Sequence, residues 1–338
     1  MAEMLGVFTN RAEWMEHAEH FLANAEKHIM SHVIPNAPTI KFEDATLAYQ
    51  RAAEAYRICE CWQEACDAYA KAADIQVRLG CPEEAASYSS EAAETMVKVN
   101  PADAIVFYRN AISLLCEVGK FGTAGRIQRK LAEWYEDDRN FDECIDQYRQ
   151  ASDYYLGDNM IEQSDICLLK CAYYQGLMEE FHEAAEIYST VGLRCMDSNL
   201  RKFNARDSFL RCGLLYLASG TEHHKKLNRK LMDFKTADPS FAFSRECLFL
   251  ENVMAMHGSS DIHAFADHIY NFDNVSHMDS WCLEMLFELR VQIQDAYDEK
   301  ERLYREALEK ARQEHEAMER EKIEKKKRMR EAIMNGNK

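Results

Sequence analysis

The sequence predicts an all-α protein built as a solenoid of stacked helices. Its 338 residues include only 12 Gly and 5 Pro, fewer turn-forming residues than a β-rich fold of this size needs. Helical segments of similar length recur up to about residue 205, and short turn signals separate them. These signals include GCP at 80–82, NP at 100–101, GKFG at 119–122 and DDRNF at 137–141.

A repeat with steps of 19 or 20 residues underlies this pattern. A small residue lies just inside each helical segment, an aromatic residue often follows four positions later, and a second small residue often follows seven positions later. This spacing places all three on one face of a helix, so we interpret the stripe as packing between helices. The first small residues are Ala45, Ala65, Ala85, Ala104, Ala124, Cys144, Ser164 and Ala184; the aromatic residues are Tyr49, Tyr69, Tyr108, Tyr148 and Tyr188; the second small residues are Ala52, Ala72, Ala92, Ala111, Ala151 and Cys171.

Two such units form an antiparallel hairpin of about 40 residues, longer than the roughly 34 residues of a tetratricopeptide repeat. We therefore expect residues 1–205 to form a tetratricopeptide-like, right-handed superhelical solenoid, interrupted by an apolar loop at 28–40. The spacing loosens beyond it, and we expect residues 206–294 to form a C-terminal helical bundle that caps the solenoid. Residues 295–338 are rich in Glu, Lys and Arg at i,i+4 spacing, which predicts a charged helical tail.

Composition limits the compartment and the partners. The N-terminus lacks the basic start and apolar core of a secretory signal, and no run of about 18 apolar residues is present, so we expect a cytoplasmic protein without a membrane span. Most of the 12 cysteines occupy small-residue positions in helices, which favours reduced thiols used for packing. The net charge of −17 argues against a nucleic-acid-binding protein, because binding phosphates needs a basic surface.

No pattern typical of catalysis stands out. GKFG at 119–122 lacks the upstream glycine and the following Ser or Thr of a phosphate loop. The histidine pairs at 17 and 20 and at 223 and 224 each lack a third ligand for zinc. We therefore expect no metal, no cofactor and no enzymatic activity. The remaining features are bases scattered through an acidic body, most simply interpreted as solvated helix faces, and the apolar loop segment HIMSHVIP at 28–35.

From Phe42 to Gln294, the order and spacing of several segments resemble the soluble NSF attachment proteins (SNAPs), the α and β kinds more than the γ kind. The resemblance implies a twisted sheet of helical hairpins capped by a bundle, and an adaptor function. SNAPs coat the four-helix bundle of an assembled SNARE complex and recruit the hexameric ATPase NSF, which pulls the bundle apart. The segments are NPADAIVFYRNAI at 100–112, QYRQASDYYLGDN at 147–159, CLLKCAYY at 167–174, EAAEIYSTVGLRCMDSNLRKFNARDSFLRC at 183–212, FSRECLFL at 243–250 and MDSWCLEMLFELRVQIQ at 278–294.

The resemblance also implies candidate site residues. An apolar loop that family members rest on a membrane corresponds here to HIMSHVIP, which implies peripheral attachment to membranes. The family's SNARE-contacting bases fall on Arg126, Lys202, Arg206 and Arg245, with Lys120 and Lys170 close by. The membrane-contacting residues of the loop are Ile29, Met30, Val33 and Ile34.

The sequence departs from the family pattern in three places. Ile166 replaces an expected lysine, and HGSS at 257–260 replaces an acidic cluster that faces NSF. Asp298–Glu301 leads into the tail, and the penultimate residue is Asn337 instead of leucine. These departures favour SNARE binding over stimulation of NSF. The alternative function is a generic solenoid scaffold for a peptide or protein partner, which a groove of asparagines and clustered lysines would favour.

Overall fold

The computed structural model describes residues 11–30, 38–198 and 201–335, with side chains at 11–30, 42–198 and 201–330. All regular structure in these ranges is helical, which confirms the predicted all-α class. The chain forms two compact units, Met1–Tyr174 and Gln175–Lys338. The division falls inside α8, Ile161–Leu177, and so differs from the predicted boundary after residue 205.

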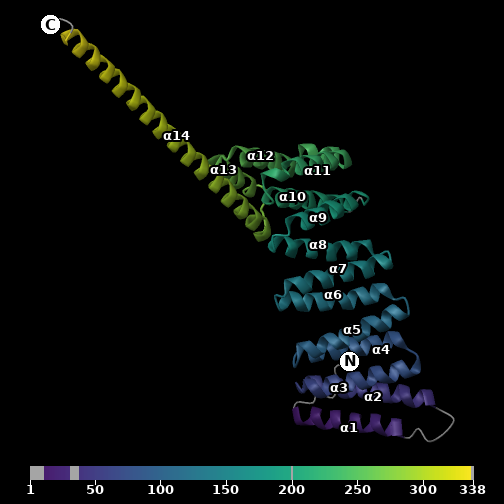
Figure 1. Cartoon of the computed structure of the whole chain (residues 1–338). Coiled ribbons are helices and arrows are strands. Elements are labelled where there is room, and N and C mark those ends of the chain that lie inside the picture. The colour runs from purple at the N-terminus through teal and green to yellow at the C-terminus, as the bar shows by residue number, and fades with distance from the viewer. Residues whose placement is uncertain (1–10, 31–37, 199–200, 336–338) are drawn as a thin grey trace. The chain divides into compact units, whose positions relative to one another are not determined.

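The first unit is a stack of antiparallel helices joined by short turns (Figure 1). Each helix packs against the next one along the chain, as the hairpin repeat predicts. The helices are α1 (Arg11–Met30), α2 (Pro38–Ile58), α3 (Trp62–Leu79), α4 (Pro82–Met96), α5 (Pro101–Glu117), α6 (Phe121–Asp137), α7 (Phe141–Gly157) and the larger part of α8.

The predicted stripe of small residues is the core of the helix stack. All eight first small residues are at most 1% exposed, and so are all six second small residues. The aromatic residues between them are buried as well. Short side chains let neighbouring helices approach closely, and Gly125 in α6 shows how closely. A Cβ atom added there would lie 3.3 Å from the carbonyl oxygen of Ala151 in α7.

Six of the turns between helices up to residue 181 share one geometry. A residue with positive φ follows the last helical turn, and the amide of the next residue donates to a carbonyl five residues back, as in a Schellman motif. Only two of these left-handed residues are glycines, Gly80 and Gly119. The turn at Asn100 differs, because its side chain caps α5 instead. The six hydrogen bonds run from Cys61 to Tyr56, Cys81 to Gln76, Lys120 to Leu115, Asn140 to Tyr135, Met160 to Tyr155 and Glu180 to Gln175, at 2.8–3.0 Å.

The second unit contains a helical bundle around an aromatic core. Phe209 stacks on Phe234 with ring centroids 4.0 Å apart, and Phe241 meets Phe209 edge-on at 5.2 Å. The helices are the end of α8, α9 (Phe181–Met196), α10 (Lys202–Ala218), η2 (Thr221–His223), α11 (His224–Ala237), η3 (Pro239–Phe243), α12 (Arg245–Ser259), α13 (Ile262–Asp273) and α14 (Ser280–Asn335).

Two predicted boundaries change in the structure. Residues 28–30 belong to α1 and residues 38–40 to α2, so both ends of the segment predicted as a loop at 28–40 are helical, and Val33 and Ile34 lie outside the described residues. The predicted cap and tail share one continuous helix, α14. Its first turns are anchored by buried side chains up to Ile293, whereas every side chain from 297 to 330 is exposed.

The cysteines and the helix hydropathy agree with the composition. All 12 cysteines are free thiols, and most are buried among helices, which confirms their role in packing. None of the helices in the described ranges combines the length and the apolar character needed to cross a bilayer.

Candidate partner-binding surfaces

Ion pairs join the even-numbered helices of the first unit. Arg57 of α2 contacts Glu91 of α4 at 3.0 Å, and Lys130 of α6 contacts Glu94 of α4. Two predicted SNARE-contacting bases belong to the same series. Lys120, the residue before α6, lies 3.2 Å from Glu83 of α4, and Lys170 of α8 lies 2.8 Å from Glu136 of α6. Much of the positive charge of these two bases is therefore balanced within the protein.

Among the acidic residues of this series, Glu136 also accepts a hydrogen bond from another helix. Besides the ammonium group of Lys170, it accepts a 2.6 Å hydrogen bond from the hydroxyl of Tyr148 in α7. Burial alone would raise the pKa of the Glu136 carboxyl, but these hydrogen bonds outweigh it and hold the pKa below its ordinary value. The Lys170 ammonium also lies 5.9 Å from the ring centroid of Tyr174. Glu136 therefore links α6 to Tyr148 of α7 and Lys170 of α8, a connection that the sequence did not predict.

Arg126 differs from these bases. It lies on α6 with its side chain exposed, and no acidic side chain in the described ranges forms an ion pair with it. Its charge is directed to solvent instead of to a neighbouring helix.

The second unit brings the other three predicted bases onto neighbouring helix starts. Lys202 begins α10 and Arg245 begins α12. Arg206, one turn into α10, donates to the hydroxyl of Ser240 in η3 at 2.8 Å and lies 3.9 Å from a carboxylate oxygen of Asp238. This contact holds the start of α10 beside the segment that leads into α12. Lys202 and Arg245 are exposed and form no ion pair with a described residue.

Two phenylalanines accompany these bases. Phe203 is 85% exposed and Phe243 is 87% exposed, the highest values among large apolar side chains in the described ranges. Phe203 follows Lys202, and Phe243 lies two residues before Arg245. Exposed aromatic side chains next to bases are typical of protein interfaces. Sequence reasoning missed both, because phenylalanine in a helical pattern is normally assigned to the core.

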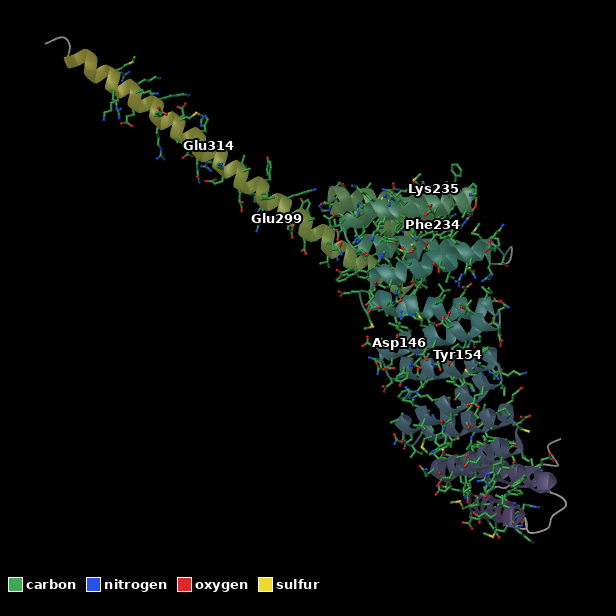
Figure 2. The ribbon with its side chains drawn as sticks, turned by 45° about the vertical axis from the view of Figure 1, so that its right-hand side comes forward. Asp146, Tyr154, Phe234, Lys235, Glu299 and Glu314 are labelled. Carbon is green, nitrogen blue, oxygen red and sulfur yellow. The ribbon has the colours of Figure 1, made fainter. Side chains whose placement is uncertain are left out.

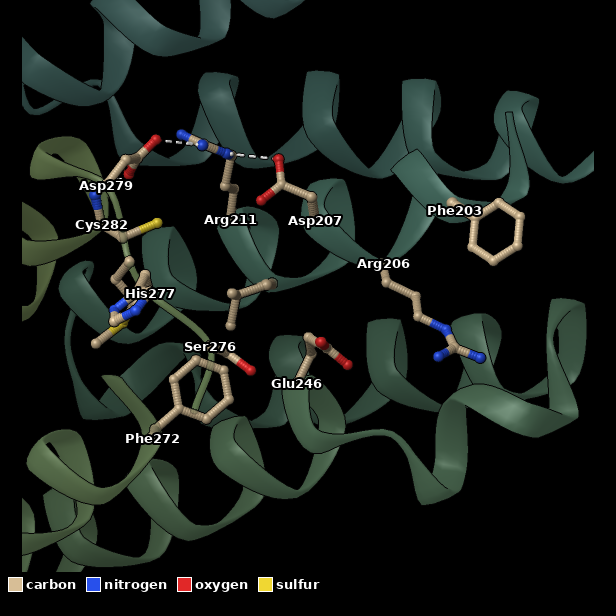
Figure 3. A pocket seen from close by; sticks show the side chains of 12 residues that line it. Phe203, Arg206, Asp207, Arg211, Glu246, Phe272, Ser276, His277, Asp279 and Cys282 are labelled. Atoms are coloured by element: carbon tan, nitrogen blue, oxygen red, sulfur yellow. Dashed lines mark hydrogen bonds and ion pairs between the residues drawn. The ribbon is translucent and has the colours of Figure 1, made fainter. Parts of the chain in front are cut away.

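A cleft of about 300 Å³ lies beside Phe203 in the second unit (Figure 3). Figure 3 shows Arg211 between Asp207 and Asp279, with ion pairs to both carboxylates. The guanidinium carbon of Arg211 also lies 5.0 Å from the ring centroid of Trp281. Since Asp279 directly precedes α14, Arg211 fixes the start of that helix to α10.

The ion pairs of Arg211 also affect the pKa of a carboxyl group in the cleft. Burial would raise the pKa of the Asp279 carboxyl, but hydrogen bonds from the backbone amide of Cys282 and from Arg211 lower it below its ordinary value. The cleft therefore carries both signs of charge beside the apolar side chains of Phe272 and Met278. No group of His, Cys, Asp or Glu in the described part of the chain is arranged to hold a metal ion.

Comparison with known proteins decides the family. The family model described as "Soluble NSF attachment protein, SNAP" matches residues 16–294. The chain belongs to the soluble NSF attachment protein family. It is 30% identical to the alpha-soluble NSF attachment protein of Homo sapiens over 257 residues, which covers 75% of this chain and 85% of the human protein. It is 29% identical to the beta protein of Bos taurus over the same shares, and 30% identical to the alpha protein of Saccharomyces cerevisiae over 59% of this chain and 68% of the yeast protein.

Membership of the SNAP family confirms the resemblance seen in the sequence, and with it the prediction of an attachment protein instead of an enzyme. The end of α12, where the sequence lacks the acidic cluster expected of a SNAP, has a different chemistry. His257 is buried there, and Ser260 ends the helix in a left-handed conformation. Lys300 of α14 donates to the carbonyl oxygen of Ser259 at 2.8 Å. Lys300 thus ties the end of α12 to α14.

The predicted membrane-contacting residues of this SNAP-family chain are only partly described. Ile29 is partly buried and packs against the core of the first unit, in the cluster that contains Ala25 and Tyr49. Met30, the last residue of α1, is 79% exposed. Among the described residues, Met30 is therefore the better candidate for contact with a membrane.

Proposed function

We propose that this chain is an adaptor that binds assembled SNARE four-helix bundles and recruits the NSF hexamer, which disassembles them during vesicle trafficking and membrane fusion. Membership of the SNAP family over residues 16–294 carries the proposal. Stacked helices also offer an extended surface, which suits a rod-shaped partner better than a small ligand.

The six candidate bases contribute unequally in this proposal. Lys120 and Lys170 already face Glu83 and Glu136, so an acidic partner gains less from them. Arg126, Lys202 and Arg245 have no ion-pair partner among the described residues, so their charge is available to attract the acidic surface of a SNARE bundle. Phe203 and Phe243 add apolar contact area beside two of these bases.

Charge reversal of the unpaired bases tests the proposal. Arg126→Glu and Arg245→Glu should each weaken binding of a soluble SNARE bundle by about 1–3 kcal/mol, because each replaces attraction with repulsion. Titration calorimetry at low salt measures the effect. Arg109→Glu on α5 is the matched control, since Arg109 is also exposed and its reversal changes the net charge equally.

A second comparison separates paired from unpaired bases. Neutralising Arg126 to Gln should cost more affinity than neutralising Lys170 to Gln, because Lys170 already has Glu136 as a partner. Affinity unchanged in both reversed variants, or reduced equally by Arg109→Glu, would rule out these bases as the SNARE-binding surface.

Peripheral membrane contact through Ile29, Met30, Val33 and Ile34 is the second part of the proposal. Replacing all four with Ser should leave binding to soluble SNARE fragments intact and slow the disassembly of complexes anchored in liposomes. Contact with the membrane raises effective concentration only when the target is anchored there. Equal losses with soluble and anchored complexes would show that these residues serve the fold, as the packing of Ile29 already suggests for that position.

A further inference from the structure

The outer part of α14 is a helix with no buried side chain among the described residues, and Lys300 near its start hydrogen-bonds to the carbonyl oxygen of Ser259 in α12. Buried side chains anchor the first turns of α14 to the second unit, and Ile293 is the last of them. Every side chain from 297 to 330 is exposed, and Figure 2 shows side chains projecting from all sides of this segment, Glu299 and Glu314 among them. At a rise of about 1.5 Å per residue, this segment is roughly 50 Å long.

Side-chain ion pairs stabilise this exposed helix along its length. Glu299 contacts Arg302 at 2.7 Å, and further pairs at i,i+3 or i,i+4 follow as far as Arg328. The sequence of α14 contains no Gly or Pro. Repeated pairs of this kind support an isolated helix in water, so residues 297–330 form a stiff stalk. The later pairs are Arg302–Glu306, Glu301–Arg305, Arg312–Glu316, Glu316–Arg320, Glu319–Lys322, Glu321–Lys325 and Glu324–Arg328.

The outer end of the stalk differs in charge from the rest of the stalk. The sequence KIEKKKRMR at 322–330, the basic tip, contains six bases and one acid, whereas residues 297–321 contain six bases and nine acids. The chain as a whole has a net charge of −17. About 40 Å of helix separates the root of the stalk from Lys325, which is several times the Debye length of about 8 Å at physiological salt. The tip therefore acts electrostatically apart from the acidic body.

The arrangement of the bases favours a fluid anionic surface over a folded partner. Residues 325–328 are all basic, and at 100° per residue they point to every side of the helix. A protein interface normally has an apolar or aromatic anchor at its centre, but the apolar residues of the tip, Ile323 and Met329, lie on different faces. No aromatic residue follows Tyr304, so the tip has no platform for stacking nucleic-acid bases. Lipid headgroups require neither feature, because they rearrange around the charges.

We propose that the basic tip of α14, residues 322–330, binds the anionic lipids of a membrane surface, with the stalk as the spacer that carries it. This site is separate from the residues at 29–34 and from the SNARE-binding bases, and the proposal requires neither SNARE complexes nor NSF.

Sedimentation of the full chain with vesicles tests the proposal. The chain should bind phosphatidylcholine vesicles that contain phosphatidylserine and bind pure phosphatidylcholine vesicles much more weakly. The difference in affinity between the two kinds of vesicle should disappear as the salt concentration increases. Replacing Lys325, Lys326, Lys327 and Arg328 with Gln should weaken binding to the anionic vesicles at least about tenfold, since each base near such a surface contributes to affinity.

A matched control removes the same charge from the stalk. Replacing Arg302, Arg305, Lys310 and Arg312 with Gln also removes four positive charges and several ion pairs from α14, yet it should retain most of the binding. Deleting residues 304–338 should abolish the binding that depends on phosphatidylserine without changing the melting temperature, because every side chain from 304 to 330 is exposed. Equal weakening by the tip and control variants, or full binding by the tip variant, would overturn the proposal. So would a tip variant that binds vesicles normally but fails in NSF-driven disassembly, because the partner would then be a protein.

Discussion

His257 and His224 form a hydrogen-bonded pair that links the end of α12 to the start of α11. The Nδ1 atom of His257 lies 3.2 Å from the Nε2 atom of His224, so one ring donates to the other and at least one ring is neutral. His257 is only 5% exposed. Burial, and then the neighbouring His224, lower its pKa to about 4, while Glu222 opposes the shift.

Stability should therefore fall as the pH drops below about 6.5 toward the folded-state pKa. The unfolded chain binds a proton at this histidine near pH 6.5, whereas the folded chain resists it, so acid favours unfolding. At pH 5 the preferential protonation of His257 in the unfolded chain lowers the free energy of unfolding by about 2 kcal/mol. His257→Gln should flatten this part of the stability profile, measured by urea unfolding from pH 7.5 to 4.5. A variant that loses stability as steeply as the parent would exclude His257 as the source.

Arg139 shows the cost of a left-handed turn at a single residue. Its φ is 59°, in a turn whose geometry is that of the glycine turns at 80 and 119. Left-handed backbone costs a residue with a side chain about 1–2 kcal/mol, whereas glycine adopts it freely at some cost in chain entropy. Arg139→Gly should therefore stabilise the protein by about 0.5–1 kcal/mol in thermal or urea unfolding.

The matched control for this substitution lies in the middle of the next helix. Arg149→Gly in α7 should destabilise the protein by about 1 kcal/mol, because glycine weakens a helix interior. If both substitutions destabilise to the same degree, the turn does not strain Arg139.

At the scale of the elements, the repeat was predictable because packing of helices leaves a periodic trace. The small residues from Ala45 to Ala184 are buried as the stripe predicts. Helix ends were predictable only where glycine, asparagine or proline marks them, as at Gly80 and Asn100. Glu60 and Glu179 end helices with the same positive φ, and neither residue type signals a turn.

The candidate site was predictable as a set of bases but not as an arrangement. The pairing of Lys170 with Glu136 joins residues 34 positions apart, and no local pattern encodes it. The exposure of Phe243 likewise depends on η3, which turns the chain just before α12. The length of α1 up to Met30 was missed because its apolar end resembled a loop that contacts a membrane.

At the scale of the whole molecule, an acidic protein has a few unpaired bases, which the proposed function assigns to contact with a SNARE complex. The chain has a net charge of −17, so its long-range electrostatic interaction with an acidic partner is repulsive and local contacts must hold the partner. Arg126, Lys202 and Arg245 are the bases that remain available for this role. In the proposed adaptor role, recruitment of NSF would not depend on an acidic cluster at the end of α12, because the sequence there is HGSS and Lys300 donates to the carbonyl oxygen of Ser259.

NSF-driven disassembly of a purified SNARE bundle, measured with ATP and with or without this chain, tests the adaptor role most directly. Disassembly should be much faster with the chain present, and the Arg126→Glu and Arg245→Glu variants should lose most of the acceleration while the Arg109→Glu control keeps it. A rate that the folded chain does not increase at any concentration, on a bundle that NSF disassembles with another SNAP, would contradict the adaptor role.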